Sequence, residues 1–459
     1  MTQPFSQLEI SELQLKNLEQ LGYSEMTPIQ AASLPLVLRG KDVIAQAKTG
    51  SGKTAAFGIG LVEGLKAADL SVQALVLCPT RELADQVAKE VRRLARAKPN
   101  VKIVLLCGGK PFGPQKKSLA NGAHIVIGTP GRTLDHLTRG TLKLRNLSTL
   151  VLDEGDRMLD MGFSEDLEQI IKQTPKNRQT LLFSATYPDE IRAMSASIQR
   201  KAEEISVDTE HETEVIDQVF YEVERHQRNN TLLALFEHHK PSSTLVFCHT
   251  KIQCDEVAQL LNDNRIHALA IHGDFDQRTR DKVLAQFSNQ SCPVLVATDV
   301  AARGIDIANL RLVINYELPR DPEIYVHRIG RTGRAGNTGS AASIFTNSEQ
   351  RRIKEIEAYQ KEPCVCDVLE SLDREPNYKL FAPMVTIEFN SGRKNKLRPG
   401  DILGALTGDA GLAGDDVGKI DIFDMASFVA VKSSRQKQVL EHFESGKIKG
   451  RAVKARRLK

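Results

Sequence analysis

The segment 42–65, DVIAQAKTGSGKTAAFGIGLVEGL, decides the fold class of this 459-residue chain. It begins with a short apolar run, continues through a glycine-rich loop and ends in a stretch with helical character. Short apolar runs separated by helical segments are typical of buried parallel strands in a doubly wound α/β sheet. Further runs of this kind follow at 74–78, 102–107, 124–128, 147–152 and 180–184.

A second series of apolar runs predicts a second α/β domain. Around residues 206–216 the chain is polar and acidic, which is typical of a linker. The apolar pattern then resumes at 244–248, 268–273, 293–298, 311–316 and 340–345. The sequence therefore predicts two doubly wound parallel-sheet domains in tandem.

A third, smaller region at 380–459 follows a turn-rich connector. Its expected order of strand, helix, two strands, helix and strand is the topology of an RNA-recognition motif. Phe428 matches the aromatic signature of that motif, but the Gly-aromatic start is missing, so other faces or the basic tail are candidates for holding RNA. The tail, 447–459, has seven Lys or Arg and no acid. A domain that binds only protein is the alternative.

Bulk properties exclude several classes of protein. The formal net charge of +4 is too small to identify a polyanionic partner by itself. The first residues do not resemble a secretory signal, and no apolar run approaches the ~18 residues that span a bilayer. Seven scattered cysteines favour reduced thiols, and the lone C-x-C of Cys364 and Cys366 argues against zinc. We therefore expect a cytoplasmic protein with no membrane partner.

The glycine-rich loop after the first apolar run predicts a phosphate site. Its backbone N–H groups and the start of the following helix would surround phosphate oxygens. Lys53 would reach the β- and γ-phosphates, and the Thr54 hydroxyl would help to hold Mg²⁺. Ala47 stands where the strict pattern has glycine. The predicted nucleotide-binding residues of the loop are Ala47, Lys48, Thr49, Gly50, Ser51, Gly52, Lys53 and Thr54.

Carboxylates follow the apolar run that ends at Leu152. In the stretch DEGD, Asp153 would hold Mg²⁺ through water and Glu154 would orient and deprotonate the attacking water. An acidic turn on a solvated face is the alternative reading. The preceding apolar run favours a strand end instead, where α/β proteins bind their ligands.

An arginine pair marks the second domain. The stretch HRIGRTGRAG, 327–336, contains Arg331 and Arg334, whose planar guanidinium groups match phosphoryl oxygens. A basic surface turn is the alternative. Because the second domain has no phosphate loop of its own, the pair is expected to serve the nucleotide of the first domain.

Taken in order, these motifs resemble those of the DEAD-box RNA helicases of superfamily 2. The resemblance covers about residues 5–346 and rests on GYSEMTPIQ, AKTGSGKT, PTRELADQ, GG, TPGR, DEGD, SAT, LVFCHT, ATDVAARGID and HRIGRTGR. The C-terminal stretch KLRPGDILGALTGDAGLAGDDVGKIDIF resembles the bacterial DbpA subgroup of that family, whose last domain recognises ribosomal RNA. The resemblance implies RecA-like domains at 1–208 and 216–362 and an RNA-binding domain at 380–459.

The resemblance also implies an activity and partners. It implies an RNA-dependent ATPase that uses ATP and Mg²⁺ to unwind or remodel structured RNA. The implied partner is a hairpin of 23S ribosomal RNA in the precursor of the large ribosomal subunit, and a monomer is expected.

Residue roles are implied in the same way. Phe5 would stack on the adenine, Gln30 would read its edge and Asp306 would contact the ribose. Ser184 and Thr186 would link the acidic motif to strand opening, while Asp156 and His327 would help to join the two domains. RNA contacts, mostly to phosphate and sugar, are implied for Thr80, Arg81, Gly108, Gly109, Thr129, Arg132, Gln277, Arg280, Thr298 and Arg303.

Gly155 departs from the family pattern, which has alanine at that position. Because the position has no reacting group and Asp153, Glu154 and Lys53 remain, we interpret the site as active. The alternatives are an RNA clamp that uses nucleotide only as a latch and a DNA helicase of the same superfamily. Replacing Glu154 with Gln, and comparing RNA with DNA as activators of ATP hydrolysis, separates the three.

Overall fold

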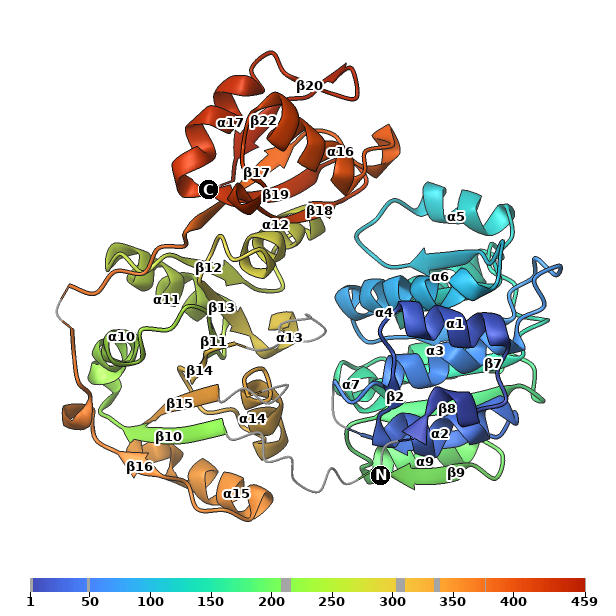
Figure 1. Ribbon diagram of the computed structural model, residues 1–459. Coiled ribbons are helices and arrows are strands. Elements are labelled where there is room, and N and C mark those ends of the chain that lie inside the picture. The colour runs from blue at the N-terminus through green and yellow to red at the C-terminus, as the bar shows by residue number, and fades with distance from the viewer. Residues whose placement is uncertain are drawn as a thin grey trace. The chain divides into compact units, whose positions relative to one another are not determined.

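A computed structural model describes residues 3–47, 50–207, 216–302, 310–333, 339–375 and 377–458 (Figure 1). The chain forms two compact units, the first holding the described residues up to 207 and the second those from 216 onward. Within the described residues, no helix combines the length and the apolar character needed to cross a bilayer.

The first unit is built on a sheet of seven parallel strands in the order β5-β6-β4-β7-β8-β3-β9. Six of them coincide with the predicted apolar runs, whereas the polar β9 was not predicted. The strands are β3 (Val43–Gln46), β4 (Ala74–Leu77), β5 (Ile103–Leu106), β6 (Ile125–Gly128), β7 (Thr149–Asp153), β8 (Gln179–Ser184) and β9 (Glu203–Ser206). A short pair, β1 (Gln3–Pro4) and β2 (Glu25–Met26), lies outside this sheet.

Two hydrophobic clusters form because strand side chains alternate between the faces of the sheet. Val43 and Ala45 belong to one cluster and Ile44 to the other. The first cluster includes side chains of α1 (Glu12–Gln20), α2 (Pro28–Leu38), α3 (Lys53–Gly64) and α4 (Arg81–Leu94). The second includes side chains of α6 (Pro130–Thr138), α7 (Gly155–Asp160), α8 (Ser164–Lys172) and α9 (Asp189–Ile198), and Leu119 of α5 (Phe112–Ala120) packs against it.

The second unit contains a corresponding parallel sheet in the order β12-β13-β11-β14-β15-β10-β16. Its strands are β10 (Ile216–Glu222), β11 (Thr244–Cys248), β12 (Ala268–Ile271), β13 (Val294–Thr298), β14 (Leu312–Asn315), β15 (Gly339–Phe345) and β16 (Cys366–Asp367). Its helices are α10 (Arg228–His239), α11 (Lys251–Asp263), α12 (Gln277–Ser288), α13 (Asp299–Ala302), α14 (Pro322–Ile329) and α15 (Gln350–Gln360). The predicted runs correspond to five of the strands, and β10 and β16 were not predicted. Most of the predicted linker, 208–215, lies outside the described residues.

The C-terminal domain, also in the second unit, has an antiparallel sheet in the order β18-β19-β17-β22. These strands are β17 (Met384–Phe389), β18 (Val417–Ile422), β19 (Ser427–Lys432) and β22 (Ala455–Arg457). One face packs against α16 (Pro399–Gly404), a π-helical turn (Ala405–Asp409) and α17 (Gln436–His442). The predicted last strand, 449–459, is divided into β21 (Arg451–Ala452) and β22, and β21 pairs with β20 (Lys447–Ile448), which was not predicted. The predicted fold class of two parallel sheets and a small C-terminal α+β domain is confirmed.

Candidate nucleotide and RNA sites

Three predicted motifs meet at one edge of the first sheet. β7, β8 and β3 are neighbours, and their carboxyl ends lead into DEGD, SAT and the glycine-rich loop. Gln46 pairs with Ser184, and Asp153 pairs with Phe183. Parallel sheets bind ligands beyond the carboxyl ends of their strands. The sheet order therefore brings together motifs that are about a hundred residues apart in the sequence.

Lys53 of the glycine-rich loop is hydrogen-bonded to the start of the same loop. Lys53 begins α3 and is buried, and its Nζ donates a hydrogen bond of 2.8 Å to the Ala47 carbonyl. Gly50 and Gly52 have φ angles of 89° and 93°, which glycine adopts without steric cost. For Lys53 to reach the β- and γ-phosphates of a nucleotide, its bond to Ala47 must be exchanged for phosphate oxygens. Lys48 and Thr49 lie outside the described residues.

The side chain of Gln30 is hydrogen-bonded to the same loop. Its side chain accepts a hydrogen bond from the backbone N–H of Thr27 at 3.0 Å, closing the first turn of α2. The amide nitrogen donates to the Gly52 carbonyl at 3.1 Å, and the Thr27 hydroxyl donates to the Ser51 carbonyl at 2.8 Å. A Cβ on Gly52 would lie 2.4 Å from Gln30 Nε2. Sequence reasoning missed Thr27, although Thr followed three residues later by Gln is a capping signal.

Phe5 lies in the hydrophobic core of the first unit. Its ring is 3% exposed and meets Tyr23 edge to face, with ring centroids 5.9 Å apart. Stacking of Phe5 on adenine therefore stays a prediction. It would require the ring to expose to the nucleotide a face that is buried in this core.

Two buried carboxylates lie at the carboxyl end of β7. Asp153 is 3% exposed, and burial, reinforced by the nearby Glu154, raises its pKa to about 7 although Lys53 opposes the shift. Glu154 has a left-handed φ of 53° and is 4% exposed. Its Oε2 lies 3.4 Å from Arg157 Nη1 and accepts no hydrogen bond from the residues that the structure describes. A buried acid that resists ionisation and an unsatisfied carboxylate oxygen fit a site for a hydrated divalent cation.

Asp156 connects the acidic motif to SAT. Its carboxylate accepts hydrogen bonds from the Thr186 N–H at 3.0 Å and the Thr186 hydroxyl at 2.9 Å. Its own N–H donates to the Ser184 hydroxyl at 3.3 Å. Burial alone would raise the pKa of Asp156, but the hydrogen bonds from Ser184 and Thr186 and the charge of Arg157 lower it. The neighbouring acids Asp153 and Asp156 are therefore shifted in opposite directions.

Gly155 occupies the first turn of α7 in a crowded place. A Cβ there would lie 2.7 Å from Cδ1 of Leu182, whose side chain is fully buried. An alanine would fit only if this methyl group moved. No reacting group is lost by having glycine.

The predicted RNA contacts of the first unit lie along the carboxyl ends of β4, β5 and β6, which are adjacent strands. Thr80 caps the N-terminus of α4, and its hydroxyl accepts a hydrogen bond from the Leu83 N–H at 3.2 Å. The guanidinium group of Arg81 lies beside Gly108, 3.2 Å from where a Cβ would stand. Thr129 directly precedes α6, Arg132 Nη1 donates to the Lys110 carbonyl at 3.0 Å, and Gly109 lies next to Lys110 with a φ of 72°. The structure thus gathers these residues at one edge.

The second unit brings its predicted RNA contacts together in the same way. Gln277 and Arg280 lie in the first turn of α12, and Thr298 ends β13. Arg280 Nη2 donates to the Ala301 carbonyl at 3.4 Å, and the Thr298 hydroxyl accepts from the Ala301 N–H at 3.4 Å. The predicted residues Arg303, Asp306 and Arg334 lie outside the described residues.

The stretch HRIGRTGR contains a buried arginine, Arg328, that pairs within the second unit. Arg328 is 1% exposed and binds both carboxylate oxygens of Asp299 at 2.6 and 2.7 Å and the Asn315 side chain at 2.9 Å. It therefore stabilises the fold, a role that sequence reasoning missed. Arg331 lies just beyond α14, and His327 is 3.9 Å from Glu323 one helical turn away.

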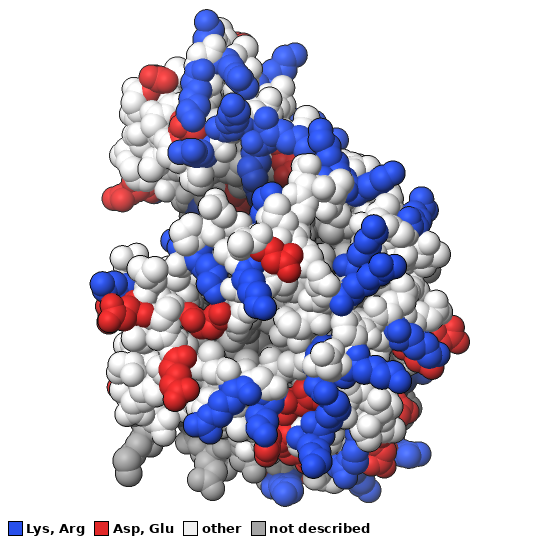
Figure 2. All heavy atoms as spheres, turned by 90° about the vertical axis from the view of Figure 1, so that its right-hand side faces the viewer, with Lys and Arg blue, Asp and Glu red and all other residues white. Residues whose placement is uncertain are grey.

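The C-terminal domain has a basic surface, and Figure 2 shows Lys and Arg side chains gathered over it, at the top of the view. Phe428, the candidate for base stacking, is only 3% exposed because it packs with Ala285 and Leu458. Its ring is therefore not available as a stacking platform.

Comparisons with known proteins agree with this geometry. Residues 27–194 match the DEAD/DEAH box helicase family, 227–336 the helicase conserved C-terminal domain and 386–457 the DbpA RNA binding domain. The chain is 50% identical to ATP-dependent RNA helicase DbpA of Escherichia coli (97% of each chain) and 39% identical to that of Bacillus subtilis (98% of each). Among solved structures, yeast Dbp5 bound to RNA and ADP BeF3 is similar, with a TM-score of 0.73 and 29% identity over 80% of this chain and 96% of that one.

Proposed function

This chain belongs to the DEAD-box ATP-dependent RNA helicases, and on that premise we propose that it remodels 23S ribosomal RNA during assembly of the large ribosomal subunit. The observation that carries the proposal is the third domain, which matches the DbpA RNA binding domain and has a basic surface. Anchoring by such a domain raises the effective concentration of the helicase core at one RNA. We also propose that the protein acts in the cytoplasm and as a monomer.

The ATP site is proposed at the edge formed by β3, β7 and β8. The loop from Ala47 to Thr54 would bind the phosphates, with Lys53 turned from the Ala47 carbonyl toward the β- and γ-phosphates. Thr54 and Asp153 would hold Mg²⁺, which neutralises phosphate charge when bound. Glu154 would orient the attacking water and accept its proton, and its Oε2, which accepts no hydrogen bond from the described residues, supports this role.

Base recognition is proposed for Gln30, with Phe5 and Asp306 as further nucleotide contacts. Because Gln30 also holds the Gly52 carbonyl, adenine binding and the shape of the phosphate loop would be coupled through one side chain. Arg331 and Arg334 are proposed to stabilise the departing γ-phosphate when ATP and RNA bind together.

The proposed RNA contacts at the strand ends are Thr80, Arg81, Gly108, Gly109, Thr129 and Arg132 in the first unit and Gln277, Arg280 and Thr298 in the second. Arg303, which lies outside the described residues, is proposed as a further contact. Contacts to phosphate and sugar would make the core tolerant of sequence, while the 2′-hydroxyl would favour RNA over DNA. Ser184 and Thr186, bonded to Asp156, would connect nucleotide binding to strand opening.

Phosphate release from ATP, measured without nucleic acid, with ribosomal RNA of each subunit and with DNA of matched sequence, tests the proposal. We expect the largest stimulation with large-subunit RNA, little with DNA, and loss of release in Glu154→Gln. Release that DNA stimulates equally would show a DNA helicase. Binding of RNA and ATP without hydrolysis would show a latch, and equal stimulation by both ribosomal RNAs would remove the large-subunit target.

A further inference from the structure

The outer face of the C-terminal sheet is covered by α12. Residues of β17 alternate, so that Ile387 and Phe389 enter the core of the C-terminal domain while Thr386 and Glu388 point the other way. Thr386 and Glu388 are nevertheless only 1% and 3% exposed. Helix α12 lies beside β17 and β19, where it can be followed in Figure 1. The buried outer face is therefore an interface with α12.

Buried hydrogen bonds fix the orientation of this interface. Asn289, directly after α12, donates from Nδ2 to the Thr386 hydroxyl at 2.8 Å. The Ser291 hydroxyl is also hydrogen-bonded to the Thr386 hydroxyl. Buried polar groups that lose such partners are costly, so the two surfaces fit in one arrangement.

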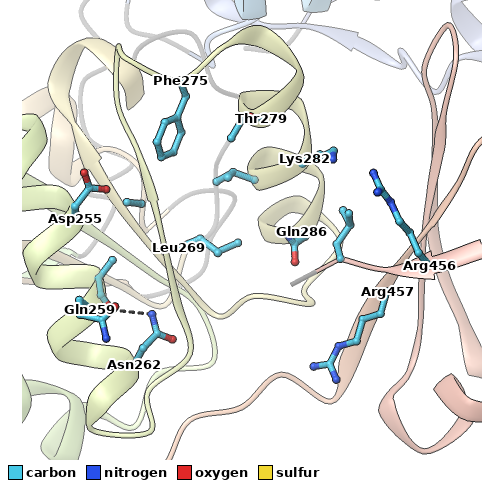
Figure 3. Close-up of a pocket in the computed structure, with 14 residues that line it drawn as sticks. Asp255, Gln259, Asn262, Leu269, Phe275, Thr279, Lys282, Gln286, Arg456 and Arg457 are labelled. Carbon is cyan, nitrogen blue, oxygen red and sulfur yellow. Dashed lines mark hydrogen bonds between the residues drawn. The ribbon is translucent and has the colours of Figure 1, made fainter.

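The interface with α12 also contains a buried carboxylate and an apolar contact. Glu388 accepts a hydrogen bond of 2.7 Å from Arg456 Nε and forms an ion pair with Arg456 Nη2 at 2.6 Å. Its carboxylate also lies 3.6 Å from both Lys282 and Arg278 of α12. Figure 3 shows Lys282 pointing from α12 toward Arg456 across a cavity of about 640 Å³. Ala285 of α12 packs with Phe428 and Leu458.

The connector leading to the C-terminal domain also makes contacts with the rest of the second unit. Arg374 binds Glu237 of α10 at 2.7 Å, and Glu375 is paired with Lys240. Leu380 forms backbone hydrogen bonds with 265 and 267 at 3.0 and 2.9 Å. Only a few residues separate Leu380 from β17, so the connector and α12 together restrict how the C-terminal domain can turn.

The same helix carries predicted RNA contacts at its other end. Gln277 and Arg280 lie in the first turn of α12, and the contacts to Thr386 come from Asn289 and Ser291 just after its last turn. Twelve helical residues span about 18 Å. RNA held at the first turn of α12 and RNA held by the C-terminal domain would therefore be separated by a fixed offset.

We propose that α12 is a rigid coupler and that Ala285, Asn289, Thr386 and Glu388 are positioning residues for the helicase reaction. Docking on α12 sets which part of an anchored RNA reaches the contacts at Gln277 and Arg280. This inference rests on the proposed function. If α12 is rigid, the enzyme opens RNA duplex at a preferred distance from the RNA segment that the C-terminal domain binds. A freely tethered domain would allow many distances.

The test uses the full chain and four variants. Ala285→Arg places a cation against Phe428, and Thr386→Val removes the buried hydroxyl at nearly constant volume. Thr386→Ser is the conservative rescue, and Gln290→Arg adds the same charge at an exposed position next to α12. Amide hydrogen exchange across β17, β19 and α12 reports whether the interface has opened.

Function is measured on large-subunit ribosomal RNA annealed to short labelled oligonucleotides at increasing distances along the RNA. The unchanged chain, Thr386→Ser and Gln290→Arg should displace one narrow group of oligonucleotides at least about tenfold faster than the rest. Ala285→Arg should flatten this profile to within about threefold, and Thr386→Val should give an intermediate profile. ATP hydrolysis stimulated by poly(U) should keep its kcat and KM in all variants.

A profile that stays sharp when hydrogen exchange shows an open interface would overturn the proposal. A flat profile in the unchanged chain would also overturn it. If Ala285→Arg also loses the stimulation of ATP hydrolysis by poly(U), its displacement profile cannot be used. The displacement profiles of Thr386→Val and Thr386→Ser are then compared to test the proposal. Absence of stimulation by large-subunit ribosomal RNA in the unchanged chain would instead contradict the proposed helicase function.

Discussion

Asp153→Asn should abolish ATP hydrolysis and, at the same time, stabilise the first unit. The Asp153 carboxyl is buried at the end of β7 and has a pKa of about 7, against an ordinary value of 3.8. Ionising it in the folded state is therefore unfavourable, as expected where a site is built for a cation rather than for stability. Asparagine keeps the shape of the side chain and carries no charge.

The size and sign follow from the pKa shift. Below pH 3.8 Asp153 is protonated in both states and costs nothing. Between pH 3.8 and 7 the unfolded chain releases the proton and the folded chain keeps it, so stability falls as pH rises. Above pH 7 the full cost of about 4 kcal/mol applies, since each pKa unit is about 1.36 kcal/mol. At pH 5 the cost is about 2 kcal/mol.

Scanning calorimetry of the nucleotide-free protein in EDTA measures the effect. Asp153→Asn should raise the melting temperature of the first unit by about 8–16 °C at pH 8 and by about half as much at pH 5. Asp156→Asn is the matched control, because hydrogen bonds from Ser184 and Thr186 lower the pKa of Asp156. That substitution should destabilise by a similar amount at pH 8 and at pH 5, because both lie above the ordinary carboxyl pKa of 3.8 and the stabilisation is lost only below it. Shifts of the same sign in both variants, or no dependence on pH for Asp153→Asn, would refute the reasoning.

Three further predictions concern other residues of the two units. Gly155→Ala should destabilise the first unit by about 1 kcal/mol, because Leu182 must move, and should keep RNA-stimulated turnover within about threefold; a tenfold loss would show that the position acts in catalysis. Arg331→Gln should lower turnover about 10³-fold with RNA binding retained, whereas Arg328→Gln should destabilise the second unit by about 3–5 kcal/mol in urea unfolding because Asp299 loses its partner. Gln30→Ala should cost about 1 kcal/mol of stability and raise the KM for ATP, since both the α2 cap and the contact to Gly52 are lost; an unchanged KM would contradict this coupling.

Strands surrounded by other strands and helices could be predicted from sequence, because burial on both faces requires continuous apolar runs. The runs at 74–78 and 244–248 became β4 and β11 in the middle of their sheets. The outermost strands β9 and β16 were missed, since EEIS and CD contain little apolar surface. β10 was missed because Ile216–Glu222 mixes polar and apolar residues next to the acidic stretch.

The candidate site could be predicted as far as it consists of strand ends. Asp153 and Lys53 were recognised because each follows an apolar run, and the sheet order brings them close. The contact of Gln30 with Gly52 and the burial of Arg328 depend on which distant segments meet, and single-residue patterns do not show this. The covering of Phe428 by Ala285 is of the same kind, since the two residues are 143 positions apart.

Pairing of β16 with β10 limits how the chain can be dissected. The Phe220 N–H donates to the Val365 carbonyl at 2.8 Å, and Phe220 and Tyr221 pair with Cys366 and Asp367. A chain cut at residue 362 would leave these N–H and C=O groups of β10 open to water and to other molecules. Open strands of this kind recruit further copies into aggregates. A shortened protein intended to report on the motor alone must therefore extend past Asp367.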